Sequence, residues 1–115
     1  MKPVNKTSVE LKKADVKSWF VYIILCTDGL LYTGITIDVN RRWQQHAGIL
    51  KSGAKFFRAR KPKTLLLVEI FNDRSSASKR EYEIKKLSRE KKLLLIESEI
   101  NQIKQISDKT MTDKK

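Results

Sequence analysis

The dipeptide Asp28-Gly29 lies between two short segments rich in β-branched and aromatic residues, and it is the strongest constraint on how this chain folds. The two segments span residues 19–27 and 30–36. An Asp-Gly pair between apolar runs favours a tight turn, because glycine adopts the left-handed backbone conformation without strain. The sequence therefore predicts an antiparallel β-hairpin.

The length of the turn decides which side chains share a face of this hairpin. A two-residue turn at Asp28-Gly29 would put Tyr22 and Tyr32 on opposite faces of the sheet. A three-residue loop that also includes Thr27 would pair Ile24 with Tyr32 and put both tyrosines on one face, because a shift of one residue turns side chains to the other face. We predict the three-residue loop, since a site that uses both tyrosines requires it.

A helix is predicted after the hairpin, over residues 39–51, with Asp38 as its N-cap and Ser52-Gly53 after its end. Arg42 and His46, the only histidine, are four residues apart and are expected on one flank of this helix. A single histidine in such a place is either a satisfied structural residue or a catalytic one. The apolar residues at helical spacing, which predict the buried stripe, are Val39, Trp43, Ala47 and Leu50.

The rest of the chain predicts a small α+β domain in which a three-stranded antiparallel sheet is flanked by helices. Residues 65–71 are apolar except for Glu69 and predict a central strand. A helix is expected from Ser75 or Ser76 to about Leu87, and a further helix from about Ser88. The apolar stripe of that last helix is predicted to consist of Leu93, Ile96, Ile100 and Ile103.

We divide the 115 residues into three parts. Residues 1–17 predict a flexible lead-in, residues 18–97 the folded domain, and residues 98–115 a helical extension with a basic tail. One cysteine, Cys26, excludes an intrachain disulfide and a cysteine-based zinc cluster. The longest apolar run, residues 19–26, is too short to span a bilayer, so a cytoplasmic protein without membrane contact is expected.

The positive charge points to nucleic acid as a partner. Twenty-five Lys and Arg against thirteen Asp and Glu give a net charge of +12, which attracts a phosphate backbone. A basic surface that only aids solubility is the other interpretation. Phe56 and Phe57, within the most basic segment, could stack on bases or anchor that segment to the domain. The candidate phosphate-binding residues of this segment are Lys51, Lys55, Arg58, Arg60, Lys61 and Lys63.

Glu81 is the outlier of the helix predicted after residue 75. It is four residues after Ala77 and three before Ile84, so it falls on or beside an apolar stripe. A carboxylate there needs a compensating partner. That partner is either a divalent metal ion or a cation of the chain, for which Arg42, Lys79 and Lys85 are the candidates.

In combination, these residues resemble the GIY-YIG nuclease family, in particular its small single-domain bacterial branch, over about residues 19–97. Phe20-Val21-Tyr22 stands where the family has Gly-Ile-Tyr, and Tyr32-Thr33-Gly34 where it has Tyr-Ile-Gly. Residues 38–46 match the family's helix, with Arg42 at the functional arginine, and Glu81 matches its metal-binding glutamate. Phe20 in place of the glycine is a departure that concerns strand packing more than the chemical groups.

The resemblance implies metal-dependent hydrolysis of phosphodiester bonds in DNA, in repair or processing. Glu81 would hold one Mg²⁺ or Mn²⁺ ion that polarises the phosphate. Tyr22 would deprotonate or position the attacking water with help from Tyr32, Arg42 would bind the phosphate, and His46 would assist proton transfer. A tyrosine is a poor base at neutral pH unless positive charge lowers its pKa.

Two alternatives remain open at this point. The chain could be a nucleic-acid-binding module without catalysis on the same scaffold. It could also be an adaptor whose last helix, with the stripe from Leu93 to Ile103, docks a protein partner.

Overall fold

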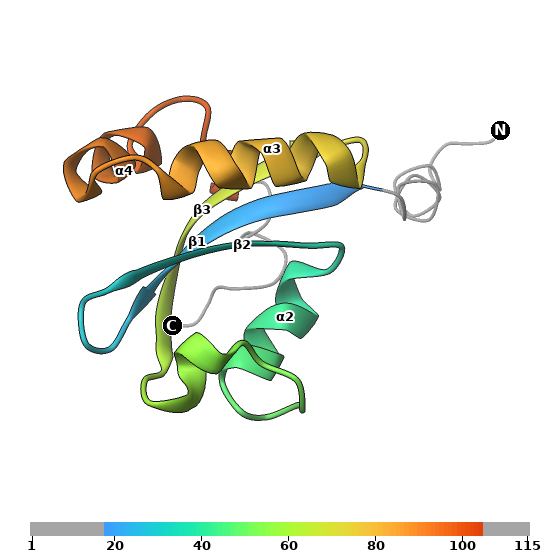
Figure 1. Ribbon diagram of the computed structural model, residues 1–115, viewed down its shortest axis with the longest axis vertical. Coiled ribbons are helices and arrows are strands. Elements are labelled where there is room, and N and C mark those ends of the chain that lie inside the picture. The colour runs from blue at the N-terminus through green and yellow to red at the C-terminus, as the bar shows by residue number, and fades with distance from the viewer. Residues whose placement is uncertain (1–17, 105–115) are drawn as a thin grey trace, which may run out of the picture.

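A computed structural model describes residues 18–104 of the chain; the expected lead-in and basic tail lie largely outside this range. Three antiparallel strands form one sheet in the order β2-β1-β3, so the predicted α+β class is confirmed. The helices α2 and η2 cover one face of the sheet, and α3 with α4 covers the other (Figure 1). The elements are β1 Trp19–Cys26, β2 Leu31–Thr36, α2 Val39–His46, the 3-10 helix η2 Lys55–Arg58, β3 Pro62–Phe71, α3 Arg74–Lys85 and α4 Arg89–Ile96.

The hairpin has the register that the three-residue loop predicts. Ile24 pairs with Tyr32, and Tyr22 pairs with Gly34. Gly29 has a φ of 89° and donates its N–H to the carbonyl of Cys26 at 2.9 Å. This left-handed residue closes the loop, so both tyrosines project from the same face.

β1 is apolar on both faces because it is the middle strand of the sheet. Val21 and Ile23 face α3 and pack with buried residues of that helix such as Ile84. Tyr22 and Ile24 face the opposite way, into the cluster that α2 and η2 complete. The chain thus has one core on each side of the sheet.

The prediction that residues 65–71 form a central strand is wrong, since β3 lies at the edge of the sheet. It is nevertheless rich in apolar residues because both of its faces are covered, and its outer edge is covered too. Asn101 Oδ1 accepts the Val68 N–H at 3.1 Å, Gln102 Oε1 accepts the Ile70 N–H at 2.9 Å, and the Gln102 N–H donates to the Val68 carbonyl at 2.8 Å. Two side chains and one backbone group therefore take the place of a fourth strand along this edge.

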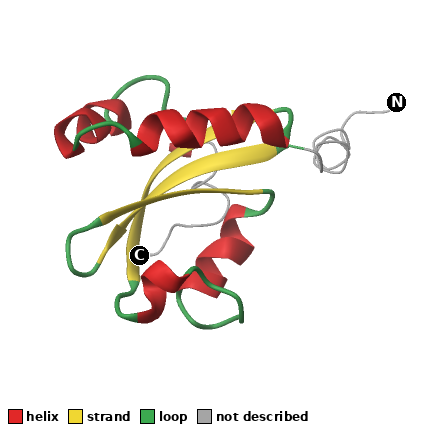
Figure 2. Cartoon of the chain, viewed as in Figure 1, coloured by secondary structure: helices red, strands yellow, loops and turns green. Residues whose placement is uncertain are grey.

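The helices are shorter than the sequence predicts. α2 ends at His46 rather than at residue 51, and the chain then turns through Gly48 and Ser52, whose φ angles are 86° and 80°. Figure 2 shows that loop and the short η2 fill most of the path from α2 to β3. α3 begins one to two residues earlier than predicted, because Asp73 and not a serine is the N-cap, accepting the Ser76 N–H.

The predicted stripe of Leu93, Ile96, Ile100 and Ile103 does not form one helical face. α4 starts near Ser88, as expected, and Ser88 is its N-cap, but the helix ends at Ile96. Ile100 is 56% exposed, and Ile103 packs against the core on the other side of the sheet from Ile96. The chain reverses here to bring residues 101–102 to the edge of β3, which a continued helix would prevent.

A buried ion pair ties α3 to the sheet. Glu69 on β3 is 4% exposed, and Arg80 donates to both of its carboxylate oxygens, at 2.8 and 3.1 Å. Such a two-pronged contact fixes the guanidinium in one plane. It holds α3 in a defined rotation over the sheet, and this rotation sets where the adjacent Glu81 lies.

Candidate active site

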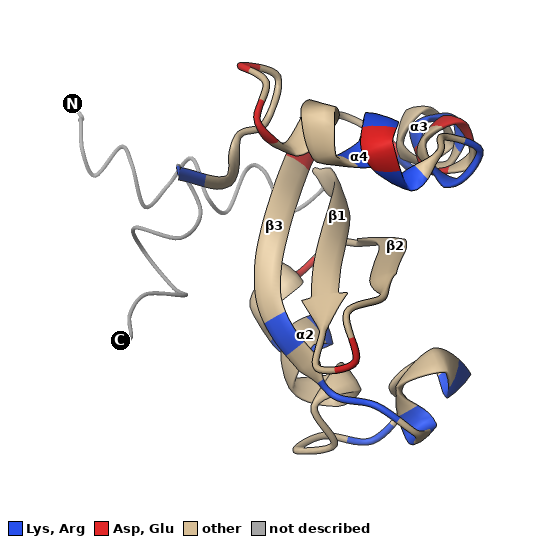
Figure 3. Cartoon of the chain, turned by 90° about the vertical axis from the view of Figure 1, so that its left-hand side faces the viewer, with Lys and Arg blue, Asp and Glu red and all other residues tan. Residues whose placement is uncertain are grey.

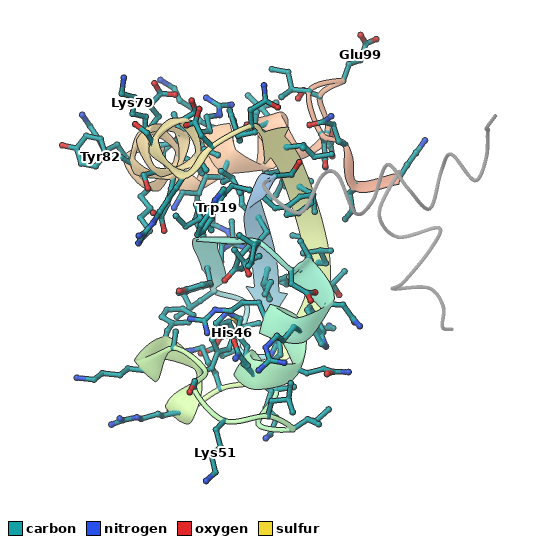
Figure 4. All side chains as sticks on the ribbon, turned by 90° about the vertical axis from the view of Figure 1, so that its right-hand side faces the viewer. Trp19, His46, Lys51, Lys79, Tyr82 and Glu99 are labelled. Carbon is teal, nitrogen blue, oxygen red and sulfur yellow. The ribbon has the colours of Figure 1, made fainter. Side chains whose placement is uncertain are left out.

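Tyr22, Tyr32 and His46 come together on the face of the sheet that α2 covers. The Tyr22 hydroxyl lies 2.9 Å from Nε2 of His46. The Tyr32 ring centroid is 6.1 Å from that of Tyr22 and 5.2 Å from that of His46. Figure 4 shows His46 between α2 and the sheet. Residues from β1, β2 and α2 thus form one cluster of polar aromatic side chains.

Gly34 permits this arrangement. It pairs with Tyr22 across the hairpin, and a Cβ atom at Gly34 would lie 2.5 Å from the Tyr22 hydroxyl and 3.0 Å from Cε2 of Tyr32. The Tyr22 ring can therefore lean over β2 only because residue 34 has no side chain. A glycine inside a strand signals such a close approach, so the sequence did carry a sign of this contact.

The hydrogen bonds of His46 define its tautomer. The backbone N–H of Ala54 donates to Nδ1 at 3.3 Å, so Nδ1 carries no proton. In a neutral ring the proton is then on Nε2, and the bond between His46 and Tyr22 runs from Nε2–H to the phenolic oxygen. Gly53 allows the chain to pass close to α2 here, because a Cβ at Gly53 would lie 2.3 Å from the Gln45 carbonyl.

Burial keeps His46 neutral. His46 is 3% exposed, and burial, with the nearby charge of Arg42 as a second cause, lowers its pKa from 6.5 to about 4. The expectation that His46 lies on a flank of the helix is therefore wrong: the helix presents it to the core. Sequence periodicity could not show this, because the Ala54 N–H that satisfies the ring comes from a loop.

Tyr22 is held in its protonated form. Burial, and then the neighbouring Tyr32, raises the pKa of Tyr22 well above its usual value near 10. The negative charge of Glu81 acts in the same direction, and the Arg42 guanidinium acts against it. Charges from α2 and α3 thus both reach the Tyr22 hydroxyl.

Arg42 lies at the rim of this cluster on α2. Its Nη1 donates to Gln45 Oε1 at 2.7 Å and to the Ser52 carbonyl at 2.8 Å. Both acceptors are neutral, so neither compensates the positive charge of the guanidinium. A guanidinium held in this way is suited to binding a phosphate at a fixed position.

Glu81 lies on α3, between the fully buried Ala77 and Ile84, and its side chain is 22% exposed. Of the compensating cations weighed from the sequence, Lys85 is the one it contacts, at 3.2 Å. Lys85 is 53% exposed, and such exposed pairs contribute little stability. Glu81 is therefore available to another cation.

The donor set fits a magnesium-type ion better than a zinc-type ion. Within residues 18–104 no group of three or more His, Cys, Asp or Glu side chains is placed to hold a metal. Mg²⁺ is commonly bound by one or two carboxylates, with water and substrate phosphate as its remaining ligands. Glu81, a single carboxylate with an exposed ion-pair partner, is a donor of the kind that this requirement describes.

Phe57 completes the cluster, and the sequence had left its role open. Its ring stacks on His46 with centroids 4.2 Å apart and lies 5.0 Å from the ring of Tyr32. At 8% exposure Phe57 anchors the basic segment to the domain. Phe56 is partly buried next to it and is covered by the guanidinium of Arg60 at 4.2 Å.

Most of the basic residues of the segment between α2 and β3 are exposed, and Figure 3 shows the Lys and Arg positions of the chain in blue. Arg60 differs from the others because it forms an ion pair with Asp28 at 2.6 Å and donates to the Phe56 carbonyl. Arg60 thus joins the segment to the hairpin loop. The remaining candidates are exposed, namely Lys51, Lys55, Arg58, Lys61 and Lys63.

This fold, with two hairpin tyrosines, an arginine and a histidine on the next helix and a glutamate on α3, defines the GIY-YIG class. The family model of the GIY-YIG catalytic domain matches residues 18–93, and the chain belongs to this family. It is similar to a UPF0213 protein of Desulfotalea psychrophila, with 46% identity over 90 residues that cover 78% of this chain and 81% of the relative.

Other relatives bear the same name. A UPF0213 protein of Staphylococcus aureus is 49% identical over 79 residues, which cover 69% of this chain and 94% of the relative. The solution structure of a UPF0213 protein from Bacillus halodurans is 38% identical, with coverage of 83% of this chain and 99% of that one and a TM-score of 0.48. Among residues 18–104, no helix has the length and apolar character needed to cross a membrane.

Proposed function

We propose that the protein is a divalent-metal-dependent endonuclease that hydrolyses phosphodiester bonds in DNA. One observation carries the proposal: Tyr22, Tyr32 and His46 form a single contacting cluster, with the charges of Arg42 and Glu81 acting on the Tyr22 hydroxyl. Structural packing alone gives no reason for a buried hydroxyl to lie within reach of the charges of both an arginine and a carboxylate.

Tyr22 is proposed to act as a hydrogen-bond donor through its hydroxyl proton. Because His46 donates Nε2–H to the phenolic oxygen, the Tyr22 proton points to another acceptor. A scissile phosphate oxygen or the attacking water is the acceptor that the reaction offers. With its raised pKa, Tyr22 orients and hydrogen-bonds that group at neutral pH instead of serving as an ionised base.

Arg42 is proposed to bind the phosphate and stabilise the charge that develops on it. Glu81 would hold Mg²⁺ or Mn²⁺ after release from Lys85, and the ion would supply Lewis-acid polarisation of the phosphate. Tyr32 packs between Tyr22, His46 and Phe57 and keeps them in place. The exposed lysines and arginines of the basic segment would contact the DNA backbone without reading its sequence.

The test is cleavage of end-labelled single-stranded, duplex and branched DNA in Mg²⁺, in Mn²⁺ and in EDTA. Arg42→Ala and Glu81→Ala are each expected to lower the cleavage rate at least about 100-fold, because each removes charge stabilisation of the transition state. Glu83→Ala is the matched control for Glu81, since it removes a carboxylate from the same helix at a 64% exposed position. Lys86→Ala controls for loss of one positive charge.

Cleavage that persists in EDTA, or that survives both active-site substitutions, would contradict the proposed site. Salt-sensitive binding without turnover on every substrate would favour the non-catalytic module instead. A role in DNA repair or processing, a cytoplasmic location and a protein partner of the C-terminal segment stay predictions from the sequence.

A further inference from the structure

A groove of about 370 Å³ lies where the end of β2 leads into α2. Its walls include Trp19 at the start of β1, Ile37 after β2, and Asp38, Arg41 and Arg42 of the α2 region. We call it the Trp19 groove. Arg42 belongs both to the proposed site and to this groove, so the groove lies next to the proposed phosphate-binding arginine.

The groove has the surface chemistry of a nucleotide-binding site. Trp19 is only partly buried: it packs against the core on the α3 side, and the guanidinium of Arg74 lies over its ring at 5.5 Å from the centre. The part of Trp19 that lines the groove is the part that a base could contact. Ile37 is 55% exposed and extends the apolar surface. Figure 4 shows Trp19 at the end of the sheet near α3. An aromatic ring with apolar surface and guanidinium groups around it matches a base and its phosphate together.

The volume also limits the occupant. About 370 Å³ is at the low end of sites that hold a small organic ligand, which suits one nucleotide and not a stretch of double helix. A base in a duplex is stacked on both faces, so it cannot offer a face to Trp19. An unpaired base can.

We propose that the Trp19 groove binds an unpaired nucleotide next to the phosphodiester held by Arg42. This inference rests on the proposed function for the position of the cut. It names the substrate class as DNA with an unpaired segment at the cleavage point, such as a flap or a fork. Fully paired duplex would contact the basic segment but leave the groove empty.

The chain has two tryptophans, Trp19 and Trp43, so fluorescence can report on the groove directly. In a Trp43→Phe variant the fluorescence comes from Trp19, and stacking of a base on the indole quenches it. The matched Trp19→Phe variant reports on Trp43, which packs against the core on the α2 side. Titrations in EDTA with a flapped duplex and a fully paired duplex of equal length separate binding from cleavage, and the anisotropy of labelled DNA gives the affinities.

We expect the flapped duplex to quench the fluorescence of Trp19 strongly and the paired duplex to quench it little. The fluorescence of Trp43 should not be quenched by either DNA. Trp19→Leu is expected to weaken binding of the flapped duplex about tenfold and to leave binding of the paired duplex unchanged. Thermal unfolding of this variant confirms that it is folded. Equal quenching by both DNAs, or binding of flapped DNA without quenching of Trp19, would overturn the inference. Quenching as expected together with no cleavage in any metal would refute the proposed endonuclease while supporting the nucleotide site.

Discussion

Acidification is expected to destabilise the protein through His46 in particular. The imidazole is buried, its Nδ1 accepts a backbone N–H, and its Nε2–H is bonded to Tyr22, so protonation must break an existing contact. The pKa of His46 is about 4 in the folded protein and near 6.5 in the unfolded chain. Between these values the unfolded chain binds a proton that the folded protein does not.

The sign and the size of the effect follow from this difference. The contribution of His46 to the free energy of unfolding is complete above pH 6.5 and is lost as the pH falls toward 4. A difference of about 2.5 between the two pKa values corresponds to about 3 kcal/mol over that interval. This is a large part of the stability of a small domain.

Two measurements check it, and the single histidine makes both unambiguous. Proton NMR of the imidazole should show no titration of the folded protein between pH 8 and 5, and nitrogen shifts should identify Nε2 as the protonated position. Urea unfolding at several pH values should give a steeper loss of stability for wild type than for His46→Gln. A histidine that titrates near 6.5 in the folded protein, or equal pH dependence of the two proteins, would refute the assigned burial and tautomer.

Further predictions concern neighbouring contacts. Thr33→Val should raise the free energy of unfolding, measured in urea, by about 1 kcal/mol. The reason is that the buried Thr33 Oγ1 has no hydrogen-bond partner within the described part of the chain. A loss of stability would show that this hydroxyl does have a partner. Gly34→Ala should cost about 2 kcal/mol and abolish cleavage, since its Cβ displaces the Tyr22 hydroxyl; unchanged cleavage would argue against that hydroxyl. Arg80→Met should cost about 3 kcal/mol in thermal or urea unfolding by leaving Glu69 buried without a counter-charge, and a cost near zero would show that water reaches this carboxylate.

The hairpin could be predicted because its determinant, Asp28-Gly29, is local. Its register does not follow from these residues alone, since both a two-residue and a three-residue loop fit them. The requirement that both tyrosines share a face selects the three-residue loop, and the pairing of Ile24 with Tyr32 confirms it. The N-cap role of Asp38 is local as well and is confirmed, and so is the start of a helix near Ser88. Such features depend on a few consecutive residues, so a single sequence contains them.

The remaining features depend on contacts between distant segments. The end of α2 at His46 is fixed by the loop that brings Ala54 back to the ring, and helix propensity through residue 51 gave no sign of it. The depth of His46, the pairing of Glu69 with Arg80 and the reversal of the chain after Ile96 have the same origin. Of the site, the residues could be proposed from the sequence, while the direction of the hydrogen bond to Tyr22 needed the structure.

The covering of the β3 edge by Asn101 and Gln102 has a practical consequence for truncation. The family match ends at residue 93, but the unit that folds extends to at least Gln102. A fragment cut at the family boundary would expose the N–H groups of Val68 and Ile70 along an unprotected strand. Exposed strands of this kind recruit other chains, so such a fragment is expected to aggregate although every proposed catalytic side chain is present.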